Sequence, residues 1–299
     1  MTALHPRPRT AGPVLALLVN AFTWGVSWWP FRQLQAMGLH PLWATTIIYV
    51  LSALAILAWR PTALRQFFGH PALWLIFLGS GVTNATFNWS VSIGDVVRVV
   101  LLFYLMPAWA VLLAWAVLGD RPTGAGLGRL LLALAGVATV LHTAGSGLPL
   151  PRTLAEWLGL AAGFSFALTN VMLRRLQDAA ASARVLAMFG GGLVMAGSVA
   201  AVGALQGSVP PLPMLSASGW LVALLLAAGF LAANLLLQYG ASRLPAHTTS
   251  LIMLSEVVVA SLSSVALGAA TLSARTLLGG LLIVLAAAWS AWPRRAPAY

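Results

Sequence analysis

The feature that most limits the fold of this chain is a succession of apolar runs between residues 13 and 289. A bilayer core is about 30 Å thick, and a helix needs roughly 20 apolar residues to span it. Soluble helices of ordinary proteins keep a polar face, which these runs lack. The pattern therefore predicts an all-α, polytopic membrane protein.

Ten such runs are separated by short joints that contain Gly, Pro and Arg. Ten spans of about 20 residues use about 200 residues, which leaves little of the 299-residue chain for a soluble domain. The predicted transmembrane helices cover residues 13–32, 42–59, 72–91, 97–118, 126–141, 154–173, 185–205, 219–239, 248–267 and 276–289.

The basic residues predict an orientation. All sixteen are arginine, and the net charge is +11. With the N-terminus in the cytoplasm, only Arg32, Arg98, Arg152 and Arg275 lie on the far side, and the other twelve lie on the cytoplasmic side. This is the asymmetry of the positive-inside rule. It explains the charge better than nucleic acid does, and it predicts a multi-pass protein of the bacterial inner (plasma) membrane with both termini cytoplasmic.

The two halves of the chain repeat each other. At an offset of 149 residues, Pro107 falls on Glu256 and Gly119 falls on Gly268. Each half has five predicted helices, which is an odd number, so the second half enters the bilayer from the opposite face. The sequence therefore predicts two inverted five-helix repeats, an architecture of many secondary transporters. The predicted repeats are residues 1–150 and 151–299.

Two residue types are missing altogether. The chain has no cysteine, so it offers neither disulfides nor Cys-ligated metal. It has no lysine, which a Walker-type phosphate loop and a retinal Schiff base both need. These absences argue against an ATP-hydrolysing subunit and against a rhodopsin, and we expect no cofactor.

Three segments resemble drug/metabolite transporters of the EamA type: FTWGVSWWPFRQL, YLMPAWAVLLAWAVLGDRPT and LSEVVVASLSSVALGAAT. The third departs from the family pattern, with Glu256 in place of proline and Ala269 in place of glutamate. The resemblance implies transport of small metabolites. Within the family, the Trp-rich first helix is most similar to exporters of aromatic amino acids and paraquat, which implies export of amino acids or aromatic cations.

Four amides form the first group of candidate substrate-binding residues. Asn84 and Asn88 share one helix face at a spacing of four, as do Asn234 and Gln238. An amide both donates and accepts hydrogen bonds, as a zwitterionic amino acid requires. The alternative is that these amides only join helices.

Glu256 and three aromatic residues form the second group. Glu256 is the one acidic residue well inside a predicted span, and an intramembrane carboxylate is a functional-site hypothesis. It would meet a substrate ammonium, carry a proton, or serve as a structural carboxyl. Trp24, Trp28 and Tyr104 would wall a cavity for aromatic or cationic substrates, or simply pack. Pro107 lies mid-helix and is the candidate hinge.

Together these features predict a secondary transporter that exports small metabolites, amino acids foremost, by alternating access through a central cavity. Two alternatives stay open: a passive channel or facilitator, and a membrane-embedded lipid-modifying enzyme. The expected partners are a small-molecule substrate and the lipid bilayer, with no nucleic acid and no metal, and the expected state is a monomer.

Overall fold

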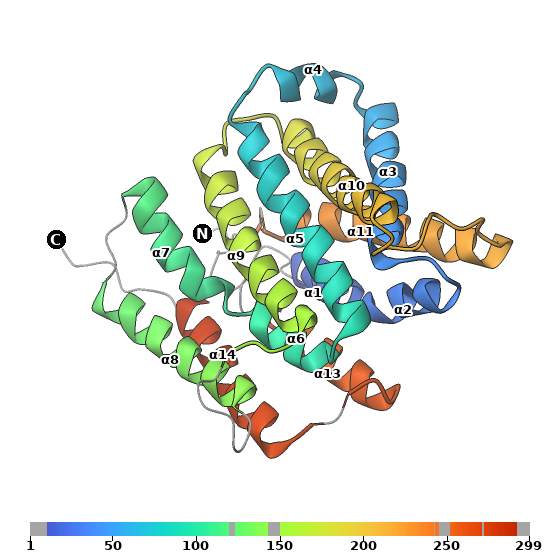
Figure 1. Ribbon diagram of the computed structural model, residues 1–299. Helices are drawn as coiled ribbons and strands as arrows, with labels where there is room; N and C mark the ends of the chain where they lie inside the picture. Colours follow the sequence, from blue (N-terminus) through green and yellow to red (C-terminus); the bar gives the residue numbers. More distant parts are fainter. Residues whose placement is uncertain are drawn as a thin grey trace, which may run out of the picture.

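The computed structural model describes residues 11–119, 123–142, 150–241, 243–244, 252–270 and 272–291, and these ranges contain helices and no strands. Figure 1 shows the helices packed as one bundle. Their bounds are α1 Ala11–Val26, α2 Trp28–Ala36, α3 Pro41–Trp59, α4 Thr62–Phe68, α5 Leu73–Ile93, α6 Val96–Phe103, α7 Met106–Leu118, α8 Gly124–Leu141, α9 Leu154–Arg175, α10 Ala181–Leu205, α11 Ala217–Ala241, α13 Ser255–Ala266 and α14 Ala274–Ala291.

Seven helices or helix pairs in the described ranges are long and apolar enough to cross a membrane. Six of them are α1 with α2, α3, α6 with α7, α8, α9 and α10, and the seventh is Ala217–Leu237 within α11. Two shorter apolar helices, Ser255–Ala266 and Ala274–Trp289, match the last two predicted spans. The remaining predicted span is α5, which has 21 residues and carries buried polar side chains. The count of ten spans stays a prediction.

Local sequence signals place the helix starts. Asp95 caps α6, with its Oδ1 accepting the backbone N–H of Arg98 at 2.9 Å. Thr153 and Glu156 form a reciprocal capping box at the start of α9, and each satisfies a backbone N–H that the helix leaves unpaired. These short polar caps fix where α6 and α9 begin, and thus which residues each helix carries into the bundle.

Three predicted helices contain a break. The run 13–32 is interrupted at Ser27, between α1 and α2. The run 97–118 is interrupted at Tyr104 and Leu105, directly before Pro107, which is the second residue of α7. In the last of the three, 248–267, residue 254 is a turn directly before α13, and residues 245–251 lie outside the described ranges. The short helix α4 joins α3 to α5 and was not expected from the sequence.

The packing of the second half mirrors that of the first. Helix α5 lies against α9 and α10, and its sequence counterpart α11 lies against α1 and α3. Likewise α6 and α7 pack on α9, whereas α13 packs on α1, and α8 pairs with α14. The tightest crossing is α5 on α10, where a Cβ on Gly191 would lie 1.9 Å from the carbonyl oxygen of Phe77. Only glycine fits there.

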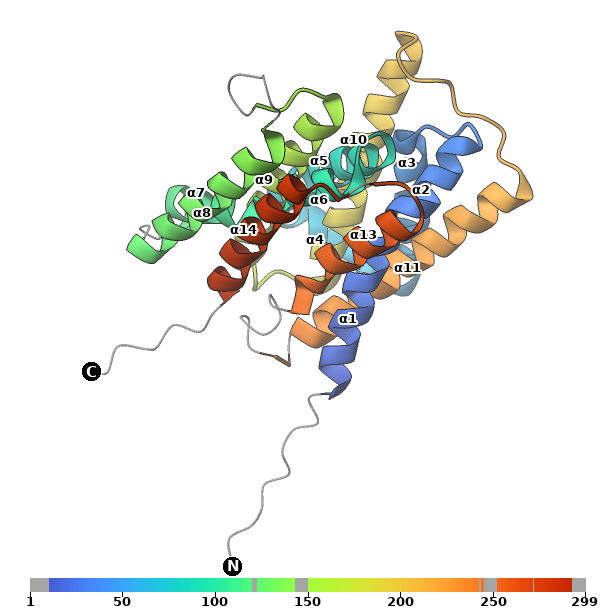
Figure 2. The ribbon, with the colours of Figure 1, turned by 90° about the horizontal axis from the view of Figure 1, so that it is seen from below.

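Contacts between helix ends sort them into two groups. At one end of the bundle, called the first end, α1 begins beside the end of α11, since Gly240 lies against the Pro13 carbonyl oxygen. In Figure 2, α1 begins and α14 ends toward the same side of the molecule. At the opposite, second end, α2 and α5 finish beside the starts of α6 and α9, where Gly94 touches Ala155. These contacts place the start of α1 with the end of α11 at the first end, and the ends of α2 and α5 with the start of α9 at the second end.

Large apolar side chains remain exposed around the bundle, as a protein surrounded by lipid requires. Leu131 on α8, Leu225 on α11 and Leu262 on α13 are each more than 60% exposed. The buried polar side chains instead gather between helices. These interior groups supply the candidate site.

Candidate functional site

Three interrupted helices meet at Glu256, in a region that we call the Glu256 junction (Gly25, Ser27, Tyr104, Leu254 and Glu256). Glu256 lies in the first turn of α13 and is 8% exposed. A Cβ on Gly25 would lie 3.1 Å from the Glu256 carbonyl oxygen, so the α1 backbone passes directly beside this turn. The break between α1 and α2 follows two residues later, at Ser27.

Tyr104 approaches the same carboxyl from the other half of the chain. It is the C-cap of α6, at the break before α7, and it is 2% exposed. Its hydroxyl donates to Glu256 Oε2 at 3.1 Å and also lies 3.3 Å from the Met253 carbonyl oxygen. The hydroxyl has a single hydrogen, so these two oxygens compete for it. The junction therefore joins one polar residue from each half.

The helix N-terminus supports a charge at this position. The first N–H groups of a helix are unpaired and carry partial positive charge, which favours an anion in the first turn. Glu256 occupies that turn of α13. A buried carboxylate with one hydroxyl donor retains capacity for a further cationic partner.

Trp28 lies near the junction, on the first residue of α2. Its indole N–H donates to Ser263 Oγ on α13 at 3.0 Å, and its side chain is 3% exposed. Ser263 lies seven residues after Glu256, which is two turns along one helix face. Trp28 thus packs over the helix that carries Glu256.

Trp24 points elsewhere. Its ring stacks on Phe230 of α11, with centroids 4.3 Å apart, and Phe31 packs on the same ring at 6.2 Å. Phe31 lies on α2 like Trp28 but packs with Trp24 on Phe230, whereas Trp28 bonds Ser263 of α13. Trp24 and Trp28, both predicted to wall one cavity, therefore have different partners, because α1 and α2 do not continue as one regular helix.

Asn84 and Asn88 lie in a second cluster, between α3 and α5. Asn84 Nδ2 donates to the Ser80 carbonyl oxygen at 2.8 Å, and Asn84 Oδ1 accepts from the Tyr49 hydroxyl. Asn88 is fully buried, and its Nδ2 donates to Thr45 Oγ1 at 3.1 Å. Two of their four amide atoms therefore bind α3, Asn84 Nδ2 binds the backbone of α5 itself, and Asn88 Oδ1 is buried without a hydrogen-bond partner among the described residues.

The remaining amides lie between α1 and α11. Asn234 is buried on α11, and its neighbour Ala233 accepts a 2.7 Å hydrogen bond from Asn20 of α1. Asn20 was not a predicted site residue, although a lone amide in an apolar run was a visible signal. The side chains of Gln238 and of the candidate hinge Pro107 lie outside the described residues.

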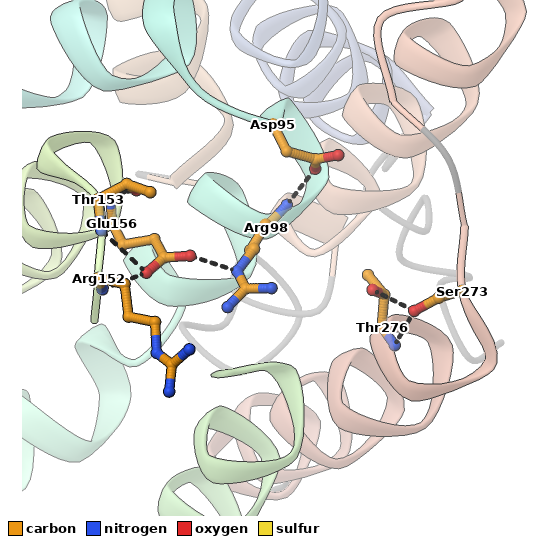
Figure 3. A network of polar contacts seen from close by, with 7 residues as sticks. All are labelled: Asp95, Arg98, Arg152, Thr153, Glu156, Ser273 and Thr276. Atoms are coloured by element: carbon orange, nitrogen blue, oxygen red, sulfur yellow. Dashed lines mark hydrogen bonds and ion pairs between the residues drawn. The ribbon is translucent and has the colours of Figure 1, made fainter. Parts of the chain in front are cut away.

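A further polar network lies at the second end of the bundle. Figure 3 shows Arg98 of α6 pointing at Glu156 of α9, and their ion pair measures 2.6 Å. The same carboxyl accepts the backbone N–H of Arg152 at 2.7 Å. Glu156 lies at the start of the predicted span 154–173 and was not a candidate residue, although the Thr-x-x-Glu spacing was readable as a cap. This network ties α6 to α9 and stands apart from the Glu256 junction.

The comparisons with known proteins agree with this fold. The model of the EamA-like transporter family matches residues 11–142 and 153–292. No curated protein matches the chain. A solved crystal structure of another protein has a TM-score of 0.57 and 18% identity, and the match covers 93% of this chain and 96% of that one. At this identity, the likeness concerns the fold alone.

The apolar helices and the two family segments make this a multi-pass membrane protein. The family consists of membrane transporters of small molecules. Its model covers nearly the whole chain in two consecutive segments. The chain therefore belongs to the EamA-like transporter family.

Proposed function

We propose that the chain is a secondary transporter that exports amino acids, including aromatic ones, by alternating access past the Glu256 junction. The observation that carries the proposal is the convergence of three broken helices on one buried carboxyl, bridged to Tyr104 of the other half at 3.1 Å. Transporters commonly bind substrate at discontinuous helices between their repeats. The proposal follows that principle.

The chemistry of the junction suits an ammonium group. Glu256 supplies a carboxylate, and the Tyr104 hydroxyl lies 3.1 Å from it. A substrate ammonium would satisfy the remaining acceptor capacity of that carboxylate. The Trp28 ring, next to the same helix, would give an aromatic or cationic side chain a π face. Asn84 and Asn88 are assigned to holding α3 and α5 together.

The packing pattern supports two inverted repeats, divided near residue 150. Helix α5 contacts α9 and α10, and α11 contacts α1 and α3, so exchanging the halves preserves the arrangement. In this proposal α7 corresponds to α13, and the first end of the bundle is cytoplasmic. The twelve arginines assigned to that side favour this orientation in a bacterial inner membrane. A monomer contains both halves of the junction.

Counterflow in proteoliposomes tests the proposal. Vesicles preloaded with one unlabelled amino acid should accumulate the same labelled compound, and a panel with and without a pH gradient gives substrate and coupling. Glu256→Gln should weaken the binding of zwitterions and cations. Asp178→Asn is the matched control, since it makes the same chemical change at an exposed carboxyl between α9 and α10.

The possible outcomes separate the alternatives. Unaltered affinity and unaltered pH response in Glu256→Gln would leave Glu256 a structural carboxyl and overturn its assigned role. Downhill flux without counterflow would identify a passive facilitator. If the pH-gradient dependence alone is lost while exchange persists, the carboxyl carries the coupling proton rather than the ammonium.

A further inference from the structure

A second polar site lies at the second end of the bundle, away from the Glu256 junction. A shallow, open pocket there is lined by Arg32, Gln35 and Ala36 at the end of α2 and by Ser92 and Ile93 at the end of α5. Ala36 and Ile93 are exposed, whereas Ser92 is buried. The pocket therefore combines a guanidinium and an amide with two small apolar walls.

The Arg32 side chain is held in place by the backbone. Its Nε donates to the Val91 carbonyl oxygen at 3.3 Å, and its Nη2 donates to the Gly94 carbonyl oxygen at 2.5 Å. Its Cζ lies 5.2 Å from the centroid of the Trp28 ring. A guanidinium has five N–H donors, so two bonds leave three for a ligand. The group is oriented before any ligand arrives.

In the part of the chain that the structure describes, no carboxylate forms an ion pair with Arg32. The ion pair in the described residues joins Arg98 to Glu156 instead. Asp95, just beyond the end of α5, uses its Oδ1 to cap α6, and its charge acts on Arg32 without forming an ion pair with it. The Ser92 hydroxyl donates inward to the Asn88 carbonyl oxygen at 2.6 Å, so it adds no donor to the pocket. Arg32 and Gln35 are therefore the donors that a ligand would meet.

We propose that this pocket is a binding site for an organic carboxylate. A planar guanidinium fork matches the two oxygens of a carboxylate, and the amide of Gln35 can donate to the same group. Ile93 and Ala36 would contact the apolar part of the ligand. The assignment of that ligand as the transported amino acid rests on the proposed function. The carboxylate site itself does not.

The positions of Trp28 and Ser263 indicate that the Arg32 pocket is a binding site separate from the Glu256 junction. Trp28 lies against Arg32 on one side and bonds Ser263 of α13 on the other. Ser263 is seven residues from Glu256, a rise of about 10.5 Å at 1.5 Å per residue. The ammonium and carboxylate of one amino acid are much closer together than that. A substrate would meet Arg32 through its carboxylate and Glu256 through its ammonium, at different stages.

Single-cysteine labelling tests this site, because the chain has no cysteine of its own. In an Ala36→Cys variant, purified in detergent, the rate of maleimide labelling reports access to the pocket. Phenylacetate should slow labelling several-fold. Phenethylamine, which has the same apolar body and the opposite charge, should not. Equal slowing by both compounds, or by neither, would overturn the proposal.

Three further variants locate the effect. Adding Arg32→Gln should remove the protection, and adding Arg32→Lys should weaken it because an ammonium lacks the planar fork. Adding Arg152→Gln removes the same charge from an exposed side chain at the same end and should leave protection intact. Protection that persists in Arg32→Gln would refute the assignment. If phenylacetate protects the cysteine from labelling but no counterflow is measured, only the transport proposal is refuted. If counterflow is measured without that protection, only the carboxylate site is refuted.

Discussion

The bond between Tyr104 and Glu256 is the contact whose removal tests the site most directly. Tyr104→Phe removes only the hydroxyl, and Glu256→Gln keeps the shape of the side chain but removes the negative charge. The two oxygens are 3.1 Å apart, longer than the 2.7–2.8 Å most common for hydroxyl donors. We therefore expect a coupling energy near the lower range for a buried bond, about 0.5–1.5 kcal/mol.

The single changes should have unequal effects. Tyr104→Phe leaves both Glu256 Oε2 and the Met253 carbonyl oxygen without this donor. An unsatisfied buried acceptor costs about 1–3 kcal/mol. In Glu256→Gln the hydroxyl keeps two possible acceptors, the new amide oxygen and the Met253 carbonyl. The loss of the donor should therefore lower the free energy of unfolding more than the loss of the charge.

The assay is a double-mutant cycle on the free energy of unfolding in detergent, with both single variants and the double variant. Tyr104→Phe combined with Asp178→Asn provides the control, because Asp178 is exposed in the loop between α9 and α10. Changes at independent sites add to within about 0.3–0.5 kcal/mol. Additivity of Tyr104→Phe with Glu256→Gln inside that margin would refute the bond, and so would a larger loss for the Gln variant alone.

Three further predictions concern packing, pH and topology. Gly191→Ala, whose Cβ would meet a backbone oxygen at 1.9 Å, should cost about 3 kcal/mol or more, whereas Gly124→Ala, with open space around it, should not lower thermal stability in detergent. Partial burial lowers the pKa of His40 below 6.5 in the folded protein. As pH falls, the unfolded chain therefore binds a proton on His40 first, and the free energy of unfolding should drop below pH 6.5. His40→Asn keeps the helix cap and should flatten this pH dependence of the melting temperature. Cysteines at Asp178 and Arg152 should be labelled by a membrane-impermeant maleimide from opposite sides of the membrane, cytoplasmic for Asp178, and labelling from one side would disprove the predicted orientation.

The sequence predicted the approximate positions of most helices, because the apolar length of a span is a property of the local chain, but it predicted neither α4 nor the breaks at Ser27 and Tyr104. The sequence also revealed some equivalent positions of the two repeated halves. Gly119 and Gly268, which were matched at an offset of 149, end α7 and α13 with φ of +76° and +68°. Left-handed backbone favours glycine at both places. A glycine that closes a helix is therefore a readable marker of equivalent positions.

Contacts between distant segments were not readable in the same way. Spacing places Asn84 on a helix face, but only the packing of α5 on α3 gives its Oδ1 the Tyr49 hydroxyl. Arg98 and Glu156 are 58 residues apart, and each lies near the start of a different predicted span. Trp24 and Trp28 diverge because a break at Ser27 resets the helical register. Pro30, in the first turn of α2, was a readable signal of that break that the sequence analysis did not use. Tertiary packing decided each of these partners.

The breaks before α7 and α13 lie at equivalent positions of the two halves, but only one of them carries an acidic side chain. Pro107 and Glu256 are each the second residue of a helix, at sequence-equivalent positions. The equivalent of Tyr104 at the same offset is Met253, since 104 plus 149 is 253. The bonded pair is thus a tyrosine from one half and a glutamate from the other, while their counterparts are a methionine and a proline. Neither counterpart has a polar side chain to repeat the bond, so the pseudo-symmetric fold carries one acidic centre rather than two. Under the proposed function, this predicts one substrate ammonium at the junction rather than a pair.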